Sequence, residues 1–255
     1  MEHMKPSTRL TLVVLLCLVA AGAGAQCRFR NTAFSAGETL SYNLYYNWKF
    51  VWVKAGTASM AIANSHYKGQ PAYRTSLTTR GNKKVDNMFV LRDTLLCYTS
   101  KDMVPLYFRK GAREGKRYTV DEVWYSYGGG KCHIRQSRLH KSGRRETRSF
   151  DPSNWTKGHV VNFPIADGNG TNPAQLKYRG KKDVKADNGV KYRCLELSYI
   201  EKDDGKWKEI VRFYVTDDDN HIPIRLDMFL KFGSAKAFLT SMKGARGEPT
   251  SIVKK

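Results

Sequence analysis

The chain has 255 residues, of which 41% are hydrophobic and 26% are charged, and this composition is sufficient to bury a sizeable core. It carries 44 Lys or Arg against 23 Asp or Glu, which gives a formal net charge of +21. No repeat or low-complexity tract divides the chain, and no segment after residue 25 is apolar enough to span a membrane. We therefore expect no transmembrane segment in the processed protein.

The first 25 residues have the pattern of an export signal. Two basic residues precede an apolar run over residues 10–20, and Ala23-Gly24-Ala25 supplies the small-x-small pattern that a signal peptidase reads. The run is too short for a membrane-spanning helix, which takes roughly twenty residues. Gln26 precedes Cys27, where a lipid-attachment site normally has a small residue, so we expect no lipid anchor there. The sequence predicts a cleaved signal peptide and a periplasmic protein.

Residues 26–255 are expected to form a single domain with four cysteines: Cys27, Cys97, Cys132 and Cys194. In an oxidising compartment four thiols allow three complete pairings, and the sequence does not choose among them. Each cysteine could equally be a small buried hydrophobe. Their wide spacing, without a C-x-x-C, argues against a redox motif or a zinc site.

Alternation of apolar and polar residues predicts β strands along most of the chain. In chain order the expected strands cover residues 40–47, 51–64, 72–81, 94–100, 106–109, 118–127, 132–140, 144–149, 174–179, 190–201, 207–216 and 222–231. Short turns such as Gly128-Gly129-Gly130 make neighbouring strands antiparallel. Three prolines and three glycines mark residues 151–173 as irregular or partly helical. We predict a mainly β fold, in which a large curved antiparallel sheet forms a barrel, half-barrel or sandwich with few short helices.

The stretch TDDDNHIPIR, residues 216–225, sets three acids beside a histidine. A calcium loop that began at Asp217 would need glycine at its sixth position and glutamate at its twelfth, but Ile222 and Met228 occupy them. A second acidic turn at residues 203–204 lies roughly 33 Å away, at the other end of a strand of about ten residues. We predict a plain bend between two strands, with a weak cation site as the alternative. No metal and no cofactor are expected.

Basic residues are concentrated between Arg109 and Arg148, where twelve Lys or Arg accompany four acids. If the strands present these cations on one surface, the surface attracts polyanions. Nucleic acid would fit such a surface, but export makes it a poor partner. We therefore expect an anionic envelope component, which would be a lipid, lipopolysaccharide or an acidic glycan. The alternative is a basic face that is only solvated.

Aromatic residues crowd the first predicted strand and the turn that follows it. In a curved sheet they either line a cavity for an apolar ligand or pack a core. The candidate ligand-binding residues combine these aromatics with the aromatic and basic residues of the cationic region: Tyr42, Tyr46, Trp48, Trp52, Trp124, Arg135 and Arg138.

Four segments carry a resemblance to a known family: GETLSYNLYYNWKFVWVKAGTASM (37–60), LRDTLLCYTSKDMVPLYFRK (91–110), LKYRGKKDVKADNGVKYRCLELSYIE (176–201) and VTDDDNHIPIRLDMFLKFGSAKAFL (215–239). In these segments and in their order the chain resembles the DUF3108 family of exported bacterial proteins of unknown function, with a Bacteroidetes-like character. The resemblance implies an antiparallel β fold in the periplasm, with no established activity to transfer.

No catalytic arrangement is evident, and we predict that the protein is not an enzyme. Cys132 and His133 are adjacent on a predicted strand, so they point to opposite faces. The predicted function is a non-catalytic periplasmic envelope protein that binds or carries an apolar or anionic ligand. One alternative is an envelope glycan hydrolase that uses two of the carboxylates of Glu38, Asp121, Glu122 and Glu196. Another is an outer-membrane assembly or scaffold protein. The oligomeric state is left open.

Overall fold

The computed structural model describes residues 31–48, 51–128, 131–140, 142–150, 160–166, 171–230 and 233–254. The predicted signal peptide and Cys27 lie outside these ranges. No disulfide joins any two of the three described cysteines, Cys97, Cys132 and Cys194. The helical part of the described structure contains no segment long and apolar enough to cross a membrane.

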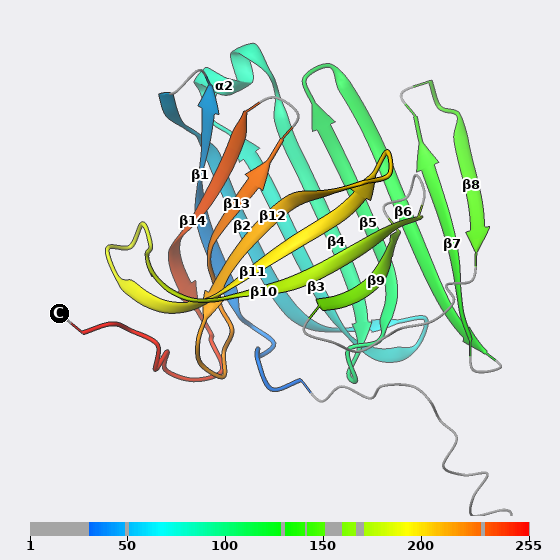
Figure 1. The fold of residues 1–255 in the computed structure, drawn as a ribbon. Helices are drawn as coiled ribbons and strands as arrows, with labels where there is room; N and C mark the ends of the chain where they lie inside the picture. Colours follow the sequence, from blue (N-terminus) through cyan, green and yellow to red (C-terminus); the bar gives the residue numbers. More distant parts are fainter. Residues whose placement is uncertain are drawn as a thin grey trace, which may run out of the picture.

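The described residues form one sheet of 14 strands (Figure 1). The strands are β1 (Thr39–Trp48), β2 (Val51–Tyr67), β3 (Gln70–Gly81), β4 (Leu91–Ser100), β5 (Pro105–Glu114), β6 (Arg117–Gly128), β7 (Lys131–Leu139), β8 (Arg145–Phe150), β9 (Val160–Ala166), β10 (Thr171–Lys185), β11 (Lys191–Asp203), β12 (Lys206–Thr216), β13 (Pro223–Phe229) and β14 (Ser234–Lys243). One short helix, α2 (Lys83–Met88), lies between β3 and β4.

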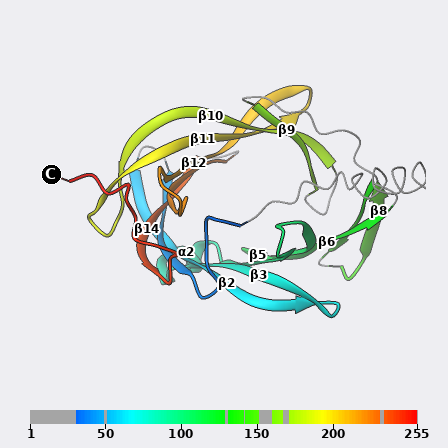
Figure 2. The same ribbon diagram turned by 90° about the horizontal axis from the view of Figure 1, so that it is seen from below.

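The sheet is built from two meanders that meet at the first and last strands. Its order is β8 to β1 followed by β14 to β9, so every pair of neighbours except β1 and β14 is consecutive in the chain. β8 and β9 are its two edges, and the sheet is not closed. Figure 2 shows the sheet bent round on itself, with β10–β12 opposite β3–β6. The predicted curved antiparallel sheet is therefore confirmed, in its open, half-barrel form.

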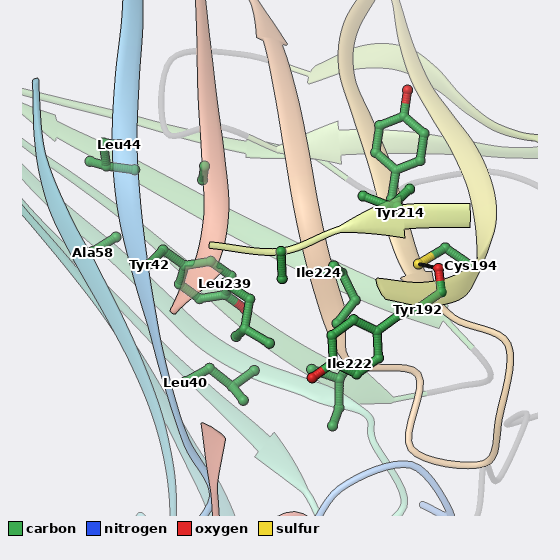
Figure 3. Close-up of a cluster of buried hydrophobic side chains, with 13 residues drawn as sticks. Leu40, Tyr42, Leu44, Ala58, Tyr192, Cys194, Tyr214, Ile222, Ile224 and Leu239 are labelled. Atoms are coloured by element: carbon green, nitrogen blue, oxygen red, sulfur yellow. Dashed lines mark hydrogen bonds between the residues drawn. The ribbon is translucent and has the colours of Figure 1, made fainter. Parts of the chain in front are cut away.

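The main core forms where the closed end of the β10–β11 hairpin meets β1, β13 and β14 (Figure 3). Leu40, Ile224 and Leu239 are fully buried there, as the alternating pattern of their strands predicts. Burying a Leu or Ile side chain stabilises a fold by about 1.5–3 kcal/mol. Tyr42 is 5% exposed, and its hydroxyl donates to the Pro223 carbonyl at 3.1 Å. The aromatic richness of β1 therefore contributes to packing.

The tip of the β10–β11 hairpin is fixed by Asp187. Its carboxylate accepts hydrogen bonds from Asn43 Nδ2 at 2.9 Å and from the Tyr45 hydroxyl at 2.8 Å. Its backbone N–H donates to the Leu239 carbonyl at 2.9 Å. These contacts join residues that are far apart in the chain and hold the hairpin against β1 and β14, where the core lies.

One expectation from the sequence was wrong, and one short helix was not anticipated at its position. Residues 160–166 and 171–173 were predicted to be irregular or partly helical, but they form β9 and the start of β10, in which Pro164 stands opposite Pro173. Pro164 is tolerated because β9 is an edge strand, and Pro173 lies one residue before β10 begins to pair with β11. Residues 151–159 and 167–170 lie outside the described residues. Helix α2 was not predicted, since its six residues bury no side chain and show no apolar periodicity; the Asn82 side chain caps its first turn.

Candidate ligand-binding surface

Strand register places five side chains in one row across β3 to β7. Arg74 stands opposite Tyr98, Tyr98 opposite Tyr107, Tyr107 opposite Trp124, and Trp124 opposite Arg135. Residues that are directly opposite in an antiparallel sheet share a face, with their Cβ atoms about 5 Å apart. The row therefore crosses the strands on a single face and begins and ends with a guanidinium.

The rings of this row contact one another. The Tyr107 and Trp124 centroids lie 5.8 Å apart, and those of Tyr98 and Tyr107 lie 6.2 Å apart. Tyr67 joins them from the end of β2, at 5.3 Å from Tyr98 and 5.8 Å from Tyr107, with its plane 16° from that of Tyr107. The Arg135 guanidinium lies 3.9 Å from the Trp124 centroid. We call the five side chains that contact one another the aromatic row, which consists of Tyr67, Tyr98, Tyr107, Trp124 and Arg135. Arg74, opposite Tyr98, is not counted in it.

Tyr67 reaches the row because β2 and β3 are joined by a tight turn. Lys68 and Gly69 both have left-handed backbone, with φ of 49° and 80°. Two such residues form the hairpin turn that matches the twist of the strands, and glycine adopts this conformation without strain. The turn fixes Tyr67 opposite Gln70 at the end of the hairpin. A loose loop would not hold the ring beside Tyr98.

A hydrogen-bonded carboxylate lies beside the row, on the same face of the sheet. Glu122 accepts from the Tyr107 hydroxyl at 2.6 Å and from Arg145 Nη1 at 2.7 Å. Arg145 also donates to Ser137 Oγ at 2.8 Å. Burial raises the pKa of Glu122, but the hydrogen bonds from Tyr107 and Arg145 outweigh it and hold the pKa below its ordinary value. Glu122 is therefore ionised at neutral pH and fixes the orientation of Tyr107.

Positive charge exceeds negative charge around the aromatic row. Arg109 stands opposite Glu122 in the β5–β6 ladder and therefore shares its face. Arg145 is 44% exposed at its side chain, and Arg135 is exposed. Burial raises the pKa of the Tyr67 hydroxyl, and the positive charge of Arg135 opposes this. A ring face is electron-rich and attracts C–H groups, whereas a guanidinium donates paired hydrogen bonds to an anion. The surface can therefore bind a flat ligand that carries acidic groups.

A shallow hollow of about 290 Å³ lies between the first strands of the same meander. It is lined mainly by small polar side chains: Ser41, Asn43, Thr57, Ser59, Thr78 and Thr240, with Tyr42, Ala58 and Arg80. Thr78 and Arg80 are an even number of residues from Arg74 on β3 and so share its face. The hollow thus adds hydroxyl groups to the face that carries the aromatic row.

The structure distributes the seven candidate residues over several places. Trp124 and Arg135 lie together in the aromatic row. Arg138 lies on the opposite face of β7, where Nε and Nη2 bond the Asp121 carboxylate at 2.5 and 3.0 Å. Tyr42 is in the core. Two candidates lie where β1 ends and β2 begins. The centroid of the Trp52 ring lies 4.2 Å from Lys236 Nζ, and the Tyr46 ring lies close to Gly233. The side chain of Trp48 lies outside the described part.

Sequence reasoning missed Tyr67, Tyr98 and Tyr107. A signal for two contacts was present, since residues that are equally distant from the centre of a tight turn become opposite neighbours. Tyr98 and Tyr107 are placed in this way about the turn that separates β4 from β5, and Trp124 and Arg135 about the glycine turn. Reading aromatic positions relative to turns would have joined these pairs.

The four carboxylates considered for hydrolysis differ in their surroundings. Asp121 is paired with Arg138, and Glu196 lies 3.3 Å from Arg212. Asp121 and Glu122 are adjacent on β6, so their side chains point to opposite faces. Glu38 is 4% exposed, and its Oε2 atom has no hydrogen-bond partner among the described residues.

The acidic stretch forms the predicted bend between β12 and β13, and the structure confirms that interpretation. Asp217 Oδ2 lies 2.7 Å from Arg193 Nε and 2.8 Å from Lys181 Nζ. Asp218 accepts from the Thr216 hydroxyl at 2.8 Å and from the backbone N–H of Ser251 at 3.2 Å. Over the described ranges, no group of three or more His, Cys, Asp or Glu is arranged to hold a metal ion.

The fold and the aromatic row define an open, barrel-like antiparallel β protein with a cationic aromatic surface. Residues 41–240 match the DUF3108 family, described as a protein of unknown function, and the chain belongs to that family. No curated protein matches the sequence.

Two solved structures are similar to the chain. A β-barrel-like protein of the domain of unknown function DUF1849 from Brucella abortus is 12% identical, with a TM-score of 0.53, and the match covers 83% of this chain and 98% of that one. A candidate lipoprotein from Parabacteroides distasonis ATCC 8503 is 11% identical with a TM-score of 0.32, over 86% of this chain and 100% of that one. The first similarity shows the barrel-like fold alone.

Proposed function

We propose that the protein is a non-catalytic protein of the bacterial periplasm that binds an acidic envelope glycan at the aromatic row. The observation that carries the proposal is the continuous set of ring contacts from Tyr67 to Trp124, which ends beneath the guanidinium of Arg135. Export is supported by the leader pattern of the first 25 residues.

The arrangement of the row favours a polymer of rings over a single small molecule. Tyr98 and Arg135 lie three strand spacings apart, roughly 14 Å, so the row is long enough for several ring units in succession. Sugar rings carry C–H groups on their faces, which pack against aromatic faces, and hydroxyl groups at their edges, which bond polar side chains. Arg109, Arg135 and Arg145 then select sugars that carry carboxylate, phosphate or sulfate groups.

An apolar cargo is less well supported. The hollow on the same face as the row is lined mainly by Ser, Thr and Asn side chains. A site for an apolar ligand is lined mostly by hydrophobic side chains. The proposal therefore takes the glycan as the ligand of this face.

Calorimetric titration with matched acidic and neutral oligosaccharides tests the proposal. We expect binding of the acidic series, and a steep loss of affinity as the salt concentration rises toward 0.15 M, where the Debye length is about 8 Å. Equal affinity for both series would contradict a role for the arginines, and absence of binding at millimolar ligand would end the proposal.

The same titration separates the proposal from the hydrolase alternative. Bound glycan should be recovered intact after long incubation. Release of shorter products, abolished in Glu122→Gln or Glu38→Gln, would replace the binding function with hydrolysis.

A further inference from the structure

Exposed apolar side chains gather at one end of the sheet. Six of them lie close to the β1–β2 turn, α2 and the β13–β14 turn, and we call this set the apolar rim: Val51, Trp52, Val53, Met88, Phe89 and Leu230. Their exposed fractions run from 40% for Trp52 to 77% for Met88. Single exposed hydrophobic residues are ordinary, but a contiguous group marks an interaction surface.

Backbone contacts bring the three segments of the rim together. The Asn82 N–H, at the start of α2, donates to the Ala55 carbonyl of β2 at 2.8 Å. Asn47 of β1 stands opposite both Trp52 of β2 and Ser234 of β14. Figure 1 shows the end of β1, helix α2 and the start of β14 at the same end of the sheet, at the top of the view.

The rim projects because the β1–β2 hairpin is longer than its neighbour. The pairing of β2 with β3 begins only at Gly56, opposite Gly81. Among the described strands, residues 51–54 of β2 therefore pair with β1 alone. Val51, Trp52 and Val53 are consecutive and all exposed, so both faces of the hairpin tip are in solvent. A core-forming strand would bury one of these faces.

Lysines surround the apolar rim. Lys54, Lys83 and Lys84 are exposed, and Lys236 Nζ lies 4.2 Å from the Trp52 centroid. Within the described residues none of these four lysines forms an ion pair with a carboxylate. The nearby Asp86 is paired with Arg92. The rim therefore combines apolar side chains that can enter a lipid layer with a local excess of positive charge.

We propose that the apolar rim docks the protein on an anionic membrane surface. Tryptophan and other amphipathic rings favour the headgroup level of a bilayer, where the apolar part is dry and the polar part is wet. Val51, Val53 and Met88 insert beside Trp52, and the lysines contact the anionic headgroups. Each lysine close to such a surface strengthens binding about fivefold.

Docking at the rim leaves the aromatic row free. Val51 and Tyr67 are the first and last residues of β2, roughly 50 Å apart, and Tyr98 lies seven residues along β4 from Leu91, roughly 23 Å beyond the end that carries α2. The membrane site and the glycan site therefore stand at opposite ends of the sheet. The docking proposal does not depend on the glycan proposal, and each has its own experiment.

Vesicle sedimentation tests the docking surface. The exported protein is mixed with vesicles of phosphatidylglycerol and phosphatidylcholine, and with vesicles of phosphatidylcholine alone. We expect binding to the anionic vesicles that is at least tenfold tighter than to the neutral ones. Two variants separate the two parts of the rim: Trp52→Ser with Met88→Ser, and Lys83→Glu with Lys84→Glu. Each should weaken anionic-vesicle binding at least tenfold.

Matched controls make the same kinds of substitution at exposed positions away from the rim. Lys185→Glu with Lys243→Glu makes the same charge change away from the rim, and Tyr178→Ser removes an aromatic side chain that is 48% exposed on β10. Both controls should bind anionic vesicles within about twofold of the unchanged protein. All positions are exposed, and circular dichroism with thermal melting verifies the fold of each variant.

Three outcomes would overturn docking. Equal losses in the rim and control variants would show attraction by net charge alone. Equal binding to neutral and anionic vesicles would remove the role of the lysines. Concentration-dependent dimers that are lost in the Trp52 and Met88 variant, with no vesicle binding, would assign the rim to a second copy of the chain.

Discussion

Arg135 and Trp124 stand directly opposite each other on β7 and β6, and the guanidinium lies 3.9 Å from the centroid of the indole ring. Both backbones belong to the sheet, so the cation is held over the ring before any ligand arrives. Such a contact contributes about 0.5–1 kcal/mol at an exposed site. An arginine that is already ordered loses less conformational entropy when it binds an anion.

The first prediction concerns the indole ring of the row. Trp124→Ala should weaken acidic-glycan binding about fivefold or more, since it removes a stacking surface and the support for Arg135. Titration calorimetry measures the effect. Trp207→Ala is the matched control because Trp207 is an exposed tryptophan outside the row. Equal losses in both variants would place the binding surface elsewhere.

The second prediction separates the Tyr107 hydroxyl from its ring. Tyr107→Phe keeps the stacking surface, so glycan affinity should change less than twofold. The pKa of Glu122 should rise, because the carboxylate loses the hydrogen bond that it accepts at 2.6 Å. Titration of the Glu122 carboxyl carbon by NMR measures the pKa. An unchanged pKa would mean that Arg145 alone holds the carboxylate ionised.

The third prediction tests the close contact of β2 and β3. A Cβ atom at Gly56 would lie 2.0 Å from the Arg80 carbonyl oxygen, so alanine requires the backbones to separate. Gly56→Ala should lower the free energy of unfolding by about 2–3 kcal/mol in urea denaturation. At Gly128 the added atom would meet nothing within 4 Å, so Gly128→Ala should stay within about 0.5 kcal/mol. A similar small effect at both positions would show that the β2–β3 ladder yields easily.

The sequence predicted those features of the fold that depend on residues close together in the chain. The buried Leu40 and Leu44 follow from the period of β1, and the acidic bend follows from the turn preference of Asp and Asn. Helix α2 escaped prediction because its N-cap contact with Val85 is local and no apolar stripe accompanies it. The alternation of β5 is interrupted by Arg109, Lys110 and Gly111, so its length became clear only from pairing with β4 and β6.

The candidate site was harder to predict because it depends on pairing between strands. Trp124 and Arg135 were selected for their residue types, and register then brought them into contact. Arg138 was selected on the same grounds, but it lies three positions after Arg135, and an odd step along a strand puts it on the other face beside Asp121. Residue type alone did not distinguish these two arginines.

The fourth prediction concerns the acidic bend. The hydrogen bonds from Lys181 and Arg193 hold the pKa of Asp217 below its ordinary value. The stability that this carboxylate contributes is present above the pKa of the unfolded chain and is lost as the pH falls through the folded value. Asp217→Asn should therefore lower the melting temperature at pH 7 and have little effect at pH 2. Asp219→Asn makes the same charge change at an exposed neighbour and should have no effect at either pH.

The fifth prediction has the opposite sign and concerns Glu38. Burial raises the pKa of this carboxyl from 4.5 to about 7, and the side chain is 4% exposed with one unpartnered oxygen. Because the folded state holds the proton more tightly, its contribution to stability is present below pH 4.5 and is lost as the pH rises through 7. At about 1.4 kcal/mol per pKa unit, this loss is at most about 3.5 kcal/mol. Glu38→Gln should flatten the decline of unfolding free energy between pH 5 and pH 8.5 in urea denaturation, and a variant that declines as steeply as the unchanged protein would show that Glu38 is ionised throughout.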